Sequence, residues 1–216
     1  MMASIPLDLD GYTDLPPGRI ANVVTYLELS RRENALSAPL PPGLAAVLQQ
    51  PVSIAAFRAL YRRIGERWLW FSRAVMNDAA LEAKLSRPGA EIFFLEREGV
   101  PVGLAELQHG EQPGDQRDEL EVAMFGVVPE EAGSGAARGL MSFLLDRAFA
   151  GGARRVWLHT CHFDSPAALP FYQRMGFRPW KTAIEVSRDP RLAGLLPREA
   201  GPHIPLIDPM ADGDGL

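Results

Sequence analysis

The chain has 216 residues, of which 47% are hydrophobic and 23% charged, which is enough for one sizeable core and predicts a single domain. The net charge of −5 argues against a nucleic-acid partner, because phosphate backbones are bound by an excess of Lys and Arg. No apolar run approaches the ~20 residues that span a bilayer, and the first residues lack the pattern of a signal peptide. The single cysteine, Cys161, excludes an intrachain disulfide and a multi-thiolate zinc site. We therefore expect a cytoplasmic protein with no membrane partner and no bound metal.

The first part of the chain indicates one strand, an irregular insertion and two helices. β-Branched and apolar residues over 20–29 predict a strand, and the proline-rich segment 30–52 reads as a loop with room for one short helical turn. After Ser53, apolar residues recur at spacings of three and four, which predicts an amphipathic helix behind a serine cap. A second helix is predicted over 77–85 and ends at the sequence SRPG.

The remaining strands are predicted from short apolar or alternating runs bounded by turn residues. They cover 91–98, 100–108, 119–128, 154–163 and 177–187, with a polar loop at 110–118. The order of strands and helices predicts a mixed α+β fold with one strand–helix–strand crossover late in the chain.

Two further helices lie between the last three strands. One begins after the glycine-rich turn and ends at Gly151. The other is predicted to have Pro166 as its first residue, to be capped by Asp164 or Ser165, and to close at Gly176. The tail from residue 188 is rich in Pro, Gly and Asp and is expected to fray toward its end.

The most unusual stretch is GVVPEEAGSGAARGL, residues 126–140, in which six consecutive small residues stand between an apolar run and a helix. Without bulky side chains a ligand can approach the main chain, and the free N–H groups of a helix's first turn bind anions. Gly133 and Gly135 can adopt positive φ there. A tight connection that packs on its sheet would explain the same residues without a ligand, so the stretch alone leaves both interpretations open.

Two motifs resemble those of one known family. VVPEEAGSGAARGLM resembles motif A of the GNAT superfamily of N-acetyltransferases, V-x-P-x-x-[RQ]-G-x-G-x-[GA], and DSPAALPFYQRMGF resembles its second signature, A-x-x-F-Y-x-x-x-G-F. The motifs stand in the family's order, and the flanking elements match from about residue 20 to 186. The resemblance implies a GNAT-like domain in residues 1–187, with a mostly antiparallel sheet, splayed strands and about four helices. Residues 188–216 would then form a C-terminal extension.

The resemblance also implies acetyl-CoA as cosubstrate, with its pyrophosphate held by main-chain N–H groups of the turn. The cofactor-binding residues that it implies are Val127, Val128, Gly133, Ser134, Gly135, Ala136, Ala137, Arg138, Asp164 and Ala168. One position departs from the family pattern: Ala132 replaces the usual Arg or Gln, and acidic Glu130 and Glu131 stand beside it. The backbone donors survive this change, whereas one charge-assisted contact to CoA is lost.

A base is expected because an alkylamine must lose its proton before it attacks a thioester. At about pH 7 the ammonium form is favoured by roughly 4.6 kcal/mol. Glu119 and Glu121 alternate with apolar residues on the strand 119–128, so both face one side of the sheet. The family places its base on this strand, and alignment of the turns selects Glu121. Glu106 on the adjacent strand is the alternative, as base or as a residue that orients the acceptor. Glu119 and Glu121 could also be solvated residues on an exposed strand face.

Tyr172 occupies the position of the family's general-acid tyrosine in PFYQRMGF. Its phenol, with a reference pKa near 10, stays protonated at neutral pH and could protonate the departing CoA thiolate. A core aromatic residue with a satisfied hydroxyl is the other interpretation.

Two more residues are candidates for contact with the acceptor. Trp70, in ERWLWFSR, could form an aromatic wall, with core packing as the default interpretation. His159 could line the acceptor site, relay a proton, or simply pack in its strand. In HTCHFD, His159 and Cys161 share one strand face and His162 takes the other, so the three cannot bind one metal ion. Cys161 is expected to be a small buried hydrophobic residue rather than a nucleophile.

The predicted function is transfer of an acetyl group from acetyl-CoA to a primary amine by direct attack in a ternary complex. The acceptor is a small-molecule or protein amine, and because dimers are common in the family, a homodimer is one expected assembly. Two alternatives stay open. A non-catalytic acyl-CoA-binding sensor or adaptor is encouraged by Ala132, and a protein-interaction module built on 30–52 would need no cofactor.

Overall fold

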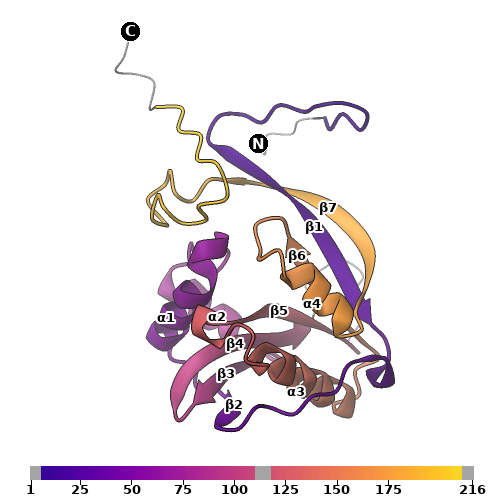
Figure 1. Ribbon diagram of the computed structural model, residues 1–216. Coiled ribbons are helices and arrows are strands. Elements are labelled where there is room, and N and C mark those ends of the chain that lie inside the picture. The colour runs from indigo at the N-terminus through magenta and orange to yellow at the C-terminus, as the bar shows by residue number, and fades with distance from the viewer. Residues whose placement is uncertain (1–5, 110–117, 211–216) are drawn as a thin grey trace.

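The computed structural model describes residues 6–109 and 118–210 and contains one seven-stranded sheet in the order β2-β3-β4-β5-β6-β1-β7 (Figure 1). The strands are β1 (Arg19–Leu29), β2 (Leu44–Leu48), β3 (Glu91–Arg97), β4 (Val100–His109), β5 (Glu119–Val127), β6 (Arg155–Cys161) and β7 (Arg178–Arg188). All neighbours pair antiparallel except β5 and β6. The predicted mixed fold, mostly antiparallel sheet and late crossover are confirmed. The loop expected at 110–118 lies, apart from Asp118, outside the described residues.

The expectation that segment 30–52 is a loop is wrong for residues 44–48, which form β2. This strand pairs antiparallel with β3 and lies at one edge of the sheet. Its five residues follow the sequence PLPPG, whose turn signal outweighs the pattern of so short a strand. The expected helical turn is present as a 3-10 helix (Arg32–Asn34).

β5 and β6 pair over only three positions, Glu119–Glu121 with Arg155–Trp157, and then separate. Opposite β4, β5 contains a bulge: Leu107 pairs with Val122 and Glu106 with Met124, which leaves one extra residue on β5. Beyond the bulge, β5 has no strand partner on its β6 side among the described residues. The predicted splay of the strands is therefore confirmed.

The first early helix begins at its predicted cap, and the second begins where its predicted range begins. α1 (Ile54–Gly65) follows Ser53, whose hydroxyl accepts a hydrogen bond from the N–H of Ala56 over 3.3 Å. α2 (Asp78–Leu85) follows Asn77, whose side chain accepts from the N–H of Ala80 over 2.8 Å. A 3-10 helix (Glu66–Trp68) connects α1 to the chain that leads toward α2.

α3 (Ala136–Ala150) ends at Gly151 as predicted, but the prediction for the start of α4 (Ala168–Arg174) is wrong. The helix begins two residues after Pro166 and has no side-chain cap. The carboxylate of Asp164 is engaged elsewhere: it accepts from the Thr160 hydroxyl over 2.7 Å and from the indole N–H of Trp70 over 2.9 Å. Competition from these tertiary donors explains why the residue does not cap the helix. None of the helices in the described part of the chain is long and apolar enough to cross a membrane.

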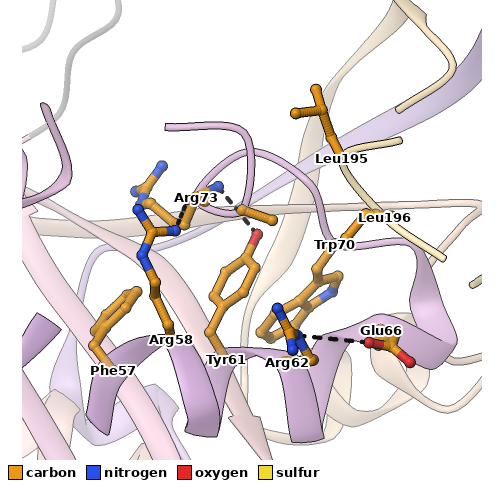
Figure 2. A pocket seen from close by; sticks show the side chains of 10 residues that line it. Phe57, Arg58, Tyr61, Arg62, Glu66, Trp70, Arg73, Leu195 and Leu196 are labelled. Carbon is orange, nitrogen blue, oxygen red and sulfur yellow. Dashed lines mark hydrogen bonds and ion pairs between the residues drawn. The ribbon is translucent and has the colours of Figure 1, made fainter. Parts of the chain in front are cut away.

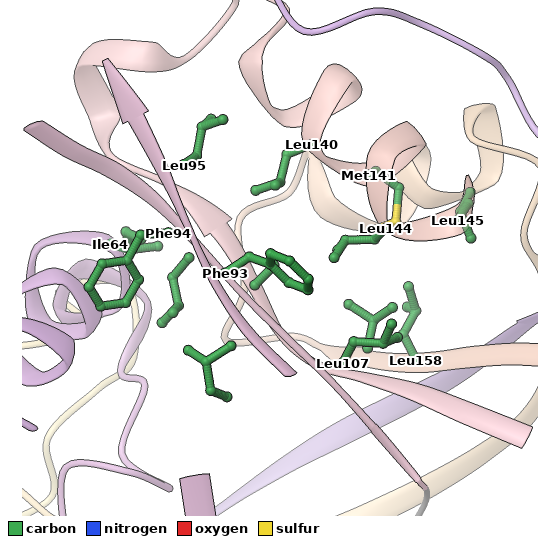
Figure 3. Packing of buried hydrophobic residues seen from close by; sticks show 14 of the residues in the cluster. Ile64, Phe93, Phe94, Leu95, Leu107, Leu140, Met141, Leu144, Leu145 and Leu158 are labelled. Atoms are coloured by element: carbon green, nitrogen blue, oxygen red, sulfur yellow. The ribbon is translucent and has the colours of Figure 1, made fainter. Parts of the chain in front are cut away.

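The core covers both faces of the sheet, as Figure 3 shows. Leu140 and Leu144 of α3 pack toward Leu95 and Phe93 of β3, whereas Phe94 points to the opposite face, toward Ile64 of α1. Because both faces are covered, β3 is a continuous buried run rather than an alternating one.

The segment before β2 packs against α3. Arg32 donates to Asp146 (2.7 Å) and to the hydroxyl of Ser142 (3.1 Å), which also accepts from the N–H of Ala38. At Gly139 a Cβ would meet the main chain of residues 39 and 40 at 2.9 Å, so glycine is needed for this close approach.

The described part of the C-terminal tail is packed, and the expected fraying is not found over residues 189–204. Arg191, which is 3% exposed, donates to the Asp189 carboxylate and to the carbonyls of Ala200 and Ile204. The apolar side chains of this segment join a second core cluster, made of Ile20, Leu69, Phe163, Leu196, Ala200 and Ile204. The segment therefore supports the connection after α1 and the loop after β6. The domain boundary expected at residue 188 stays a prediction.

Candidate functional site

The glycine-rich turn leads from β5 into α3 with the predicted backbone conformation. Gly133 has a φ of +79° and Gly135 a φ of +89°, values that favour glycine. In the described parts of the chain, no group accepts a hydrogen bond from the main-chain N–H of Gly133, Gly135, Ala137 or Arg138. These donors stand at the positive end of a 15-residue helix, an arrangement that suits an anion.

Arg97 and Ser134 bind the carboxylate of Glu131, one of the two acidic residues beside the turn. Glu131 is 7% exposed, and Arg97 Nε lies 2.6 Å from its Oε1. Hydrogen bonding to this guanidinium holds the pKa of Glu131 below its usual range. The hydroxyl of Ser134 donates to Glu131 (2.9 Å) and accepts from the N–H of Ala136 (3.1 Å). The turn is thus braced, and Glu131 does not present an uncompensated charge to an anion.

A cleft of about 430 Å³ extends from the turn along the open side of β5 to α4. The predicted cofactor residues that line it are Val127, Val128, Gly133, Ala137, Asp164 and Ala168. Ser134, Gly135, Ala136 and Arg138 are not among its lining residues, and Ala136 is fully buried. The structure therefore brings the two sequence motifs to opposite walls of one cleft.

Two arginines that the motifs do not predict, Arg67 and Arg174, also line this cleft. Arg174 occupies an unspecified position of the second signature, and Arg67 lies in the connection after α1, outside both motifs. The cleft thus combines main-chain donors with two guanidinium groups, the partners that phosphate groups commonly find in proteins. Only the folded arrangement reveals them, because no sequence pattern links the two positions.

Ala132 lines the cleft beside the turn, so a longer cationic side chain at this position would point to the same anion site. We expect Ala132→Arg to tighten acetyl-CoA binding by about 1 kcal/mol, through one exposed charge-assisted contact. Titration calorimetry measures this change, with Ala132→Met as the uncharged control of similar length. Equal or weaker binding of Ala132→Arg would mean that the turn holds the anion in another way.

Tyr172 of α4 is 8% exposed and lines the cleft with its neighbours Phe125 and Phe171. Burial raises the pKa of its phenol, and the nearby Asp164 carboxylate raises it further. No described residue forms a hydrogen bond with its hydroxyl. The phenol is therefore protonated at neutral pH and has its proton available to a ligand.

A second cavity, the recess, adjoins the cleft and has a volume of about 130 Å³. The residues that line both cavities are Trp68, Trp70, Phe125, Asp164 and Tyr172. Both predicted substrate-binding residues, Trp70 and His159, line the recess. Tyr172 therefore stands in the wall that the cleft and the recess share.

Trp70 is held in place from several sides. Its indole N–H donates to Asp164, and a Cβ on either Gly65 or Gly126 would collide with Trp70 or with Ile64, at 2.4–2.5 Å. Figure 2 shows the side of Trp70 away from the recess, where it stands beside Tyr61 on α1 and faces Leu196 of the C-terminal tail. The indole is thus packed in the core and also forms a wall of the two cavities. Both interpretations of Trp70 from the sequence, core packing and an aromatic wall, therefore apply.

Glu121 lies one residue layer behind the recess. It is 7% exposed, and its Oε2 accepts from the side chain of Gln108 over 3.1 Å. Its Oε1 lies 3.9 Å from Nε2 of His159, which lines the recess and is 41% exposed. Glu119, on the same strand face, instead forms an ion pair with Arg155 at 2.7 Å. Of these two glutamates, Glu121 is the one that lies close to a residue of the recess, namely His159.

Glu106 is fully buried and is not among the residues that line either cavity. Its two carboxylate oxygens accept hydrogen bonds from Arg73 at 3.0–3.2 Å, and Arg73 is itself 7% exposed. This ion pair anchors the connection between α1 and α2 to the sheet. The geometry gives Glu106 a clear structural role beneath the recess.

Cys161 and His159 both line the recess from β6, as their shared strand face predicts, whereas His162 lies in the turn that follows. Burial raises the pKa of the Cys161 thiol to about 11, with the Asp164 carboxylate as a smaller cause. Burial also lowers the pKa of His159, against the opposing effects of Asp164 and Glu185. At neutral pH the recess therefore holds a neutral imidazole and a protonated thiol, so Cys161 is a poor nucleophile.

Comparison with known proteins agrees with this geometry. Uncharacterised N-acetyltransferases of Mycobacterium bovis and Mycobacterium tuberculosis are 33% identical over 108 residues, which is 50% of this chain and 65% of each relative. The chain thus spans slightly less than two thirds of the length of these relatives. Among solved structures, a GCN5-related N-acetyltransferase from Kribbella flavida is 22% identical with a TM-score of 0.52, covering 82% of this chain and 63% of that one.

A second solved structure, an aminoglycoside acetyltransferase from an uncultured soil metagenomic sample in complex with sisomicin, is 16% identical with a TM-score of 0.52. The match covers 62% of this chain and 87% of that one. At these identities the two structures support the fold. The model of the acetyltransferase (GNAT) family matches residues 55–177, which include the turn, the cleft and α4. The chain belongs to the GNAT family of acetyltransferases.

Proposed function

We propose that this protein transfers the acetyl group of acetyl-CoA to a primary amine by direct attack, with acetyl-CoA in the cleft and the amine in the recess. The observation that carries the proposal is that Tyr172 lines both the cleft and the recess, and that its protonated hydroxyl has no partner in the described residues. Family membership supports acyl transfer in general. The amine acceptor and the ternary mechanism are inferred from the charges and groups around the recess.

The residues of the cleft fit the phosphate groups of acetyl-CoA. The N–H groups of Gly133 and Ala137 face no described acceptor, and a Cβ built on Gly133 would meet nothing within 4 Å. Arg67 and Arg174 add charge on the other walls. When it is bound there, acetyl-CoA supplies an acyl group activated as a thioester.

Residues of this chain then transfer the protons of the reaction. During transfer, a C–N bond forms as the C–S bond breaks, and an acceptor that arrives as an ammonium ion loses two protons in total. Tyr172 gives its hydroxyl proton to the departing sulfur and recovers one proton from the amine. The other proton leaves through the recess, where the neutral imidazole of His159 accepts it. The carboxylates of Asp164 and Glu185 favour the imidazolium, and Oε1 of Glu121 lies 3.9 Å from its Nε2. Cys161 takes no part, and no acyl-enzyme forms.

This route predicts how activity depends on pH. Because the pKa of His159 lies below its usual value of about 6.5, the ring is protonated only in more acidic solution, where kcat/KM should fall. Glu121→Gln should lower kcat/KM at about pH 7 and recover toward about pH 9, where more of the amine arrives neutral. A pH–rate profile with one amine measures both effects.

Glu119→Gln is the control, because that residue faces the same side of the sheet but is paired with Arg155. It should leave the shape of the profile unchanged. Alkaline recovery in Glu106→Gln instead of Glu121→Gln would place the base on β4. Recovery in neither variant would mean that the amine binds already neutral.

The proposed function is tested by following CoA thiol release and acetylated product together, with a panel of primary amines and a short peptide. Equal amounts of thiol and acetylated amine, both dependent on the amine, are expected. Calorimetric binding of acetyl-CoA without release by any amine would identify an acyl-CoA sensor instead of an enzyme.

A further inference from the structure

Two carboxylates, those of Asp164 and Glu185, line the recess into which the acceptor is proposed to bind. Asp164 stands where the recess meets the cleft, since it lines both cavities. Glu185, on the exposed strand β7, lines the recess but not the cleft. The side-chain amide of Asn22, which is 5% exposed, donates to Glu185 Oε2 over 3.0 Å and orients this carboxylate. No Lys or Arg is among the described residues that line the recess, so the recess attracts cations and repels carboxylates.

Cationic side chains on the elements that form the recess are engaged by other partners. Arg73 is bound by Glu106, and Arg155 lies 2.7 Å from both Glu28 and Glu119. The ammonium of Lys181 lies over the ring of Tyr26, at 4.3 Å from its centroid. Asp164 receives its hydrogen bonds from neutral donors, the Trp70 indole, the Thr160 hydroxyl and the N–H of Cys161. Among the described residues, Asp164 and Glu185 are therefore the acidic residues that line the recess, and no basic Lys or Arg lines it beside them.

Apart from these carboxylates, the recess is small and mostly apolar. Its volume of about 130 Å³ has room for one small ring, and the recess is partly open to solvent. Most residues of its walls are apolar or aromatic, among them Trp68, Trp70, Phe71, Phe125 and Phe163. A hydroxyl-rich amine with several rings would leave polar groups unpaired against these walls, at about 1–3 kcal/mol for each group. A single ring on a short chain fits both the space and its chemistry.

We propose that the acceptor is a small primary amine with an apolar, preferably aromatic, body and no carboxylate, and that Glu185 attracts its ammonium form into the recess. This inference rests on the proposed function and narrows its acceptor class. It sets the chain apart from its metagenomic structural neighbour, which was solved with the aminoglycoside sisomicin.

Three commercially available amines test the acceptor class: 2-phenylethylamine, phenylalanine and sisomicin. Phenylalanine has the same ring and amine with one added carboxylate, so it isolates the effect of charge. We expect kcat/KM for 2-phenylethylamine to exceed that for phenylalanine by at least about tenfold, and sisomicin to remain unmodified. Because Trp68 and Trp70 line the recess, tryptophan fluorescence reports amine binding in the absence of acetyl-CoA.

Variants of Glu185 test the role of its charge. Glu185→Gln should raise KM for 2-phenylethylamine by about three- to tenfold while acetyl-CoA affinity stays unchanged, since the residue lies outside the cleft. Glu185→Lys should weaken 2-phenylethylamine further and reduce its advantage over phenylalanine. Glu33→Gln, which alters a 71% exposed carboxylate outside the recess, is the control and should behave as wild type.

The outcomes separate this inference from the function on which it rests. Acetylation of sisomicin or a peptide, with 2-phenylethylamine neither bound nor acetylated, would overturn the acceptor class and leave acyl transfer intact. Wild-type kinetics of Glu185→Lys would overturn the role of Glu185. If 2-phenylethylamine changes the fluorescence of wild type but not of Glu185→Lys, and no amine is acetylated, the recess assignment stands and the proposed function falls.

Discussion

Tyr172→Phe should lower kcat by about 10- to 1000-fold and leave acetyl-CoA affinity within about threefold of wild type. The variant removes only the hydroxyl that protonates the sulfur, while the ring keeps its packing against Phe125, Phe171 and Phe177. Single-turnover kinetics with a saturating amine measure the chemical step directly.

Tyr61→Phe is the matched control for this experiment. Tyr61 is also buried and lines the recess, but its hydroxyl is engaged with Ser72 and with the N–H of Arg73. Its loss should cost about 1 kcal/mol of stability and leave the chemical step near wild type. A Tyr172→Phe variant with an unchanged single-turnover rate would remove Tyr172 from the mechanism.

Glu106→Ala should destabilise the protein by about 3–5 kcal/mol, because it leaves the guanidinium of Arg73 buried without its partner. Urea unfolding measures this loss. The surface pair of Glu91 with Arg147 is the control, and Glu91→Ala should cost at most about 1 kcal/mol. A Glu106→Ala variant as stable as wild type but inactive would instead make Glu106 a chemical participant.

The parts of this protein that can be predicted from sequence are those in which neighbouring residues decide the structure. The cap at Ser53, the positive φ of Gly133 and Gly135, and the helix that follows them all depend on local sequence. The cleft could also be anticipated, because both family motifs are short and continuous. Strand alternation correctly placed Glu119 and Glu121 on one face, but it could not tell which of them is paired with Arg155.

The features missed by sequence reasoning depend on contacts between distant segments. β2 forms because the β3 edge lies beside it, not because LAAVL has a strong strand pattern. Asp164 does not cap α4 because Trp70, 94 residues away in sequence, donates to it. Glu106 and Glu185 look alike in sequence, yet one is buried against Arg73 and the other lines the exposed side of the recess. Burial and partner identity were therefore needed to sort the carboxylates.

We expect an acyl-CoA to bind with its phosphates at the turn before α3. Gly133 and Gly152 offer a matched pair for testing it: both have positive φ, +79° and +91°, and a Cβ on either would meet nothing within 4 Å. Only Gly133 lines the cleft, whereas Gly152 stands at the far end of the helix. The measurement is calorimetric titration of acetyl-CoA into wild type, Gly133→Glu and Gly152→Glu. Acetyl-CoA should bind at least about tenfold more weakly to Gly133→Glu alone, because the carboxylate of this variant repels the phosphates. Equal affinities of all three proteins would contradict phosphate binding at this turn.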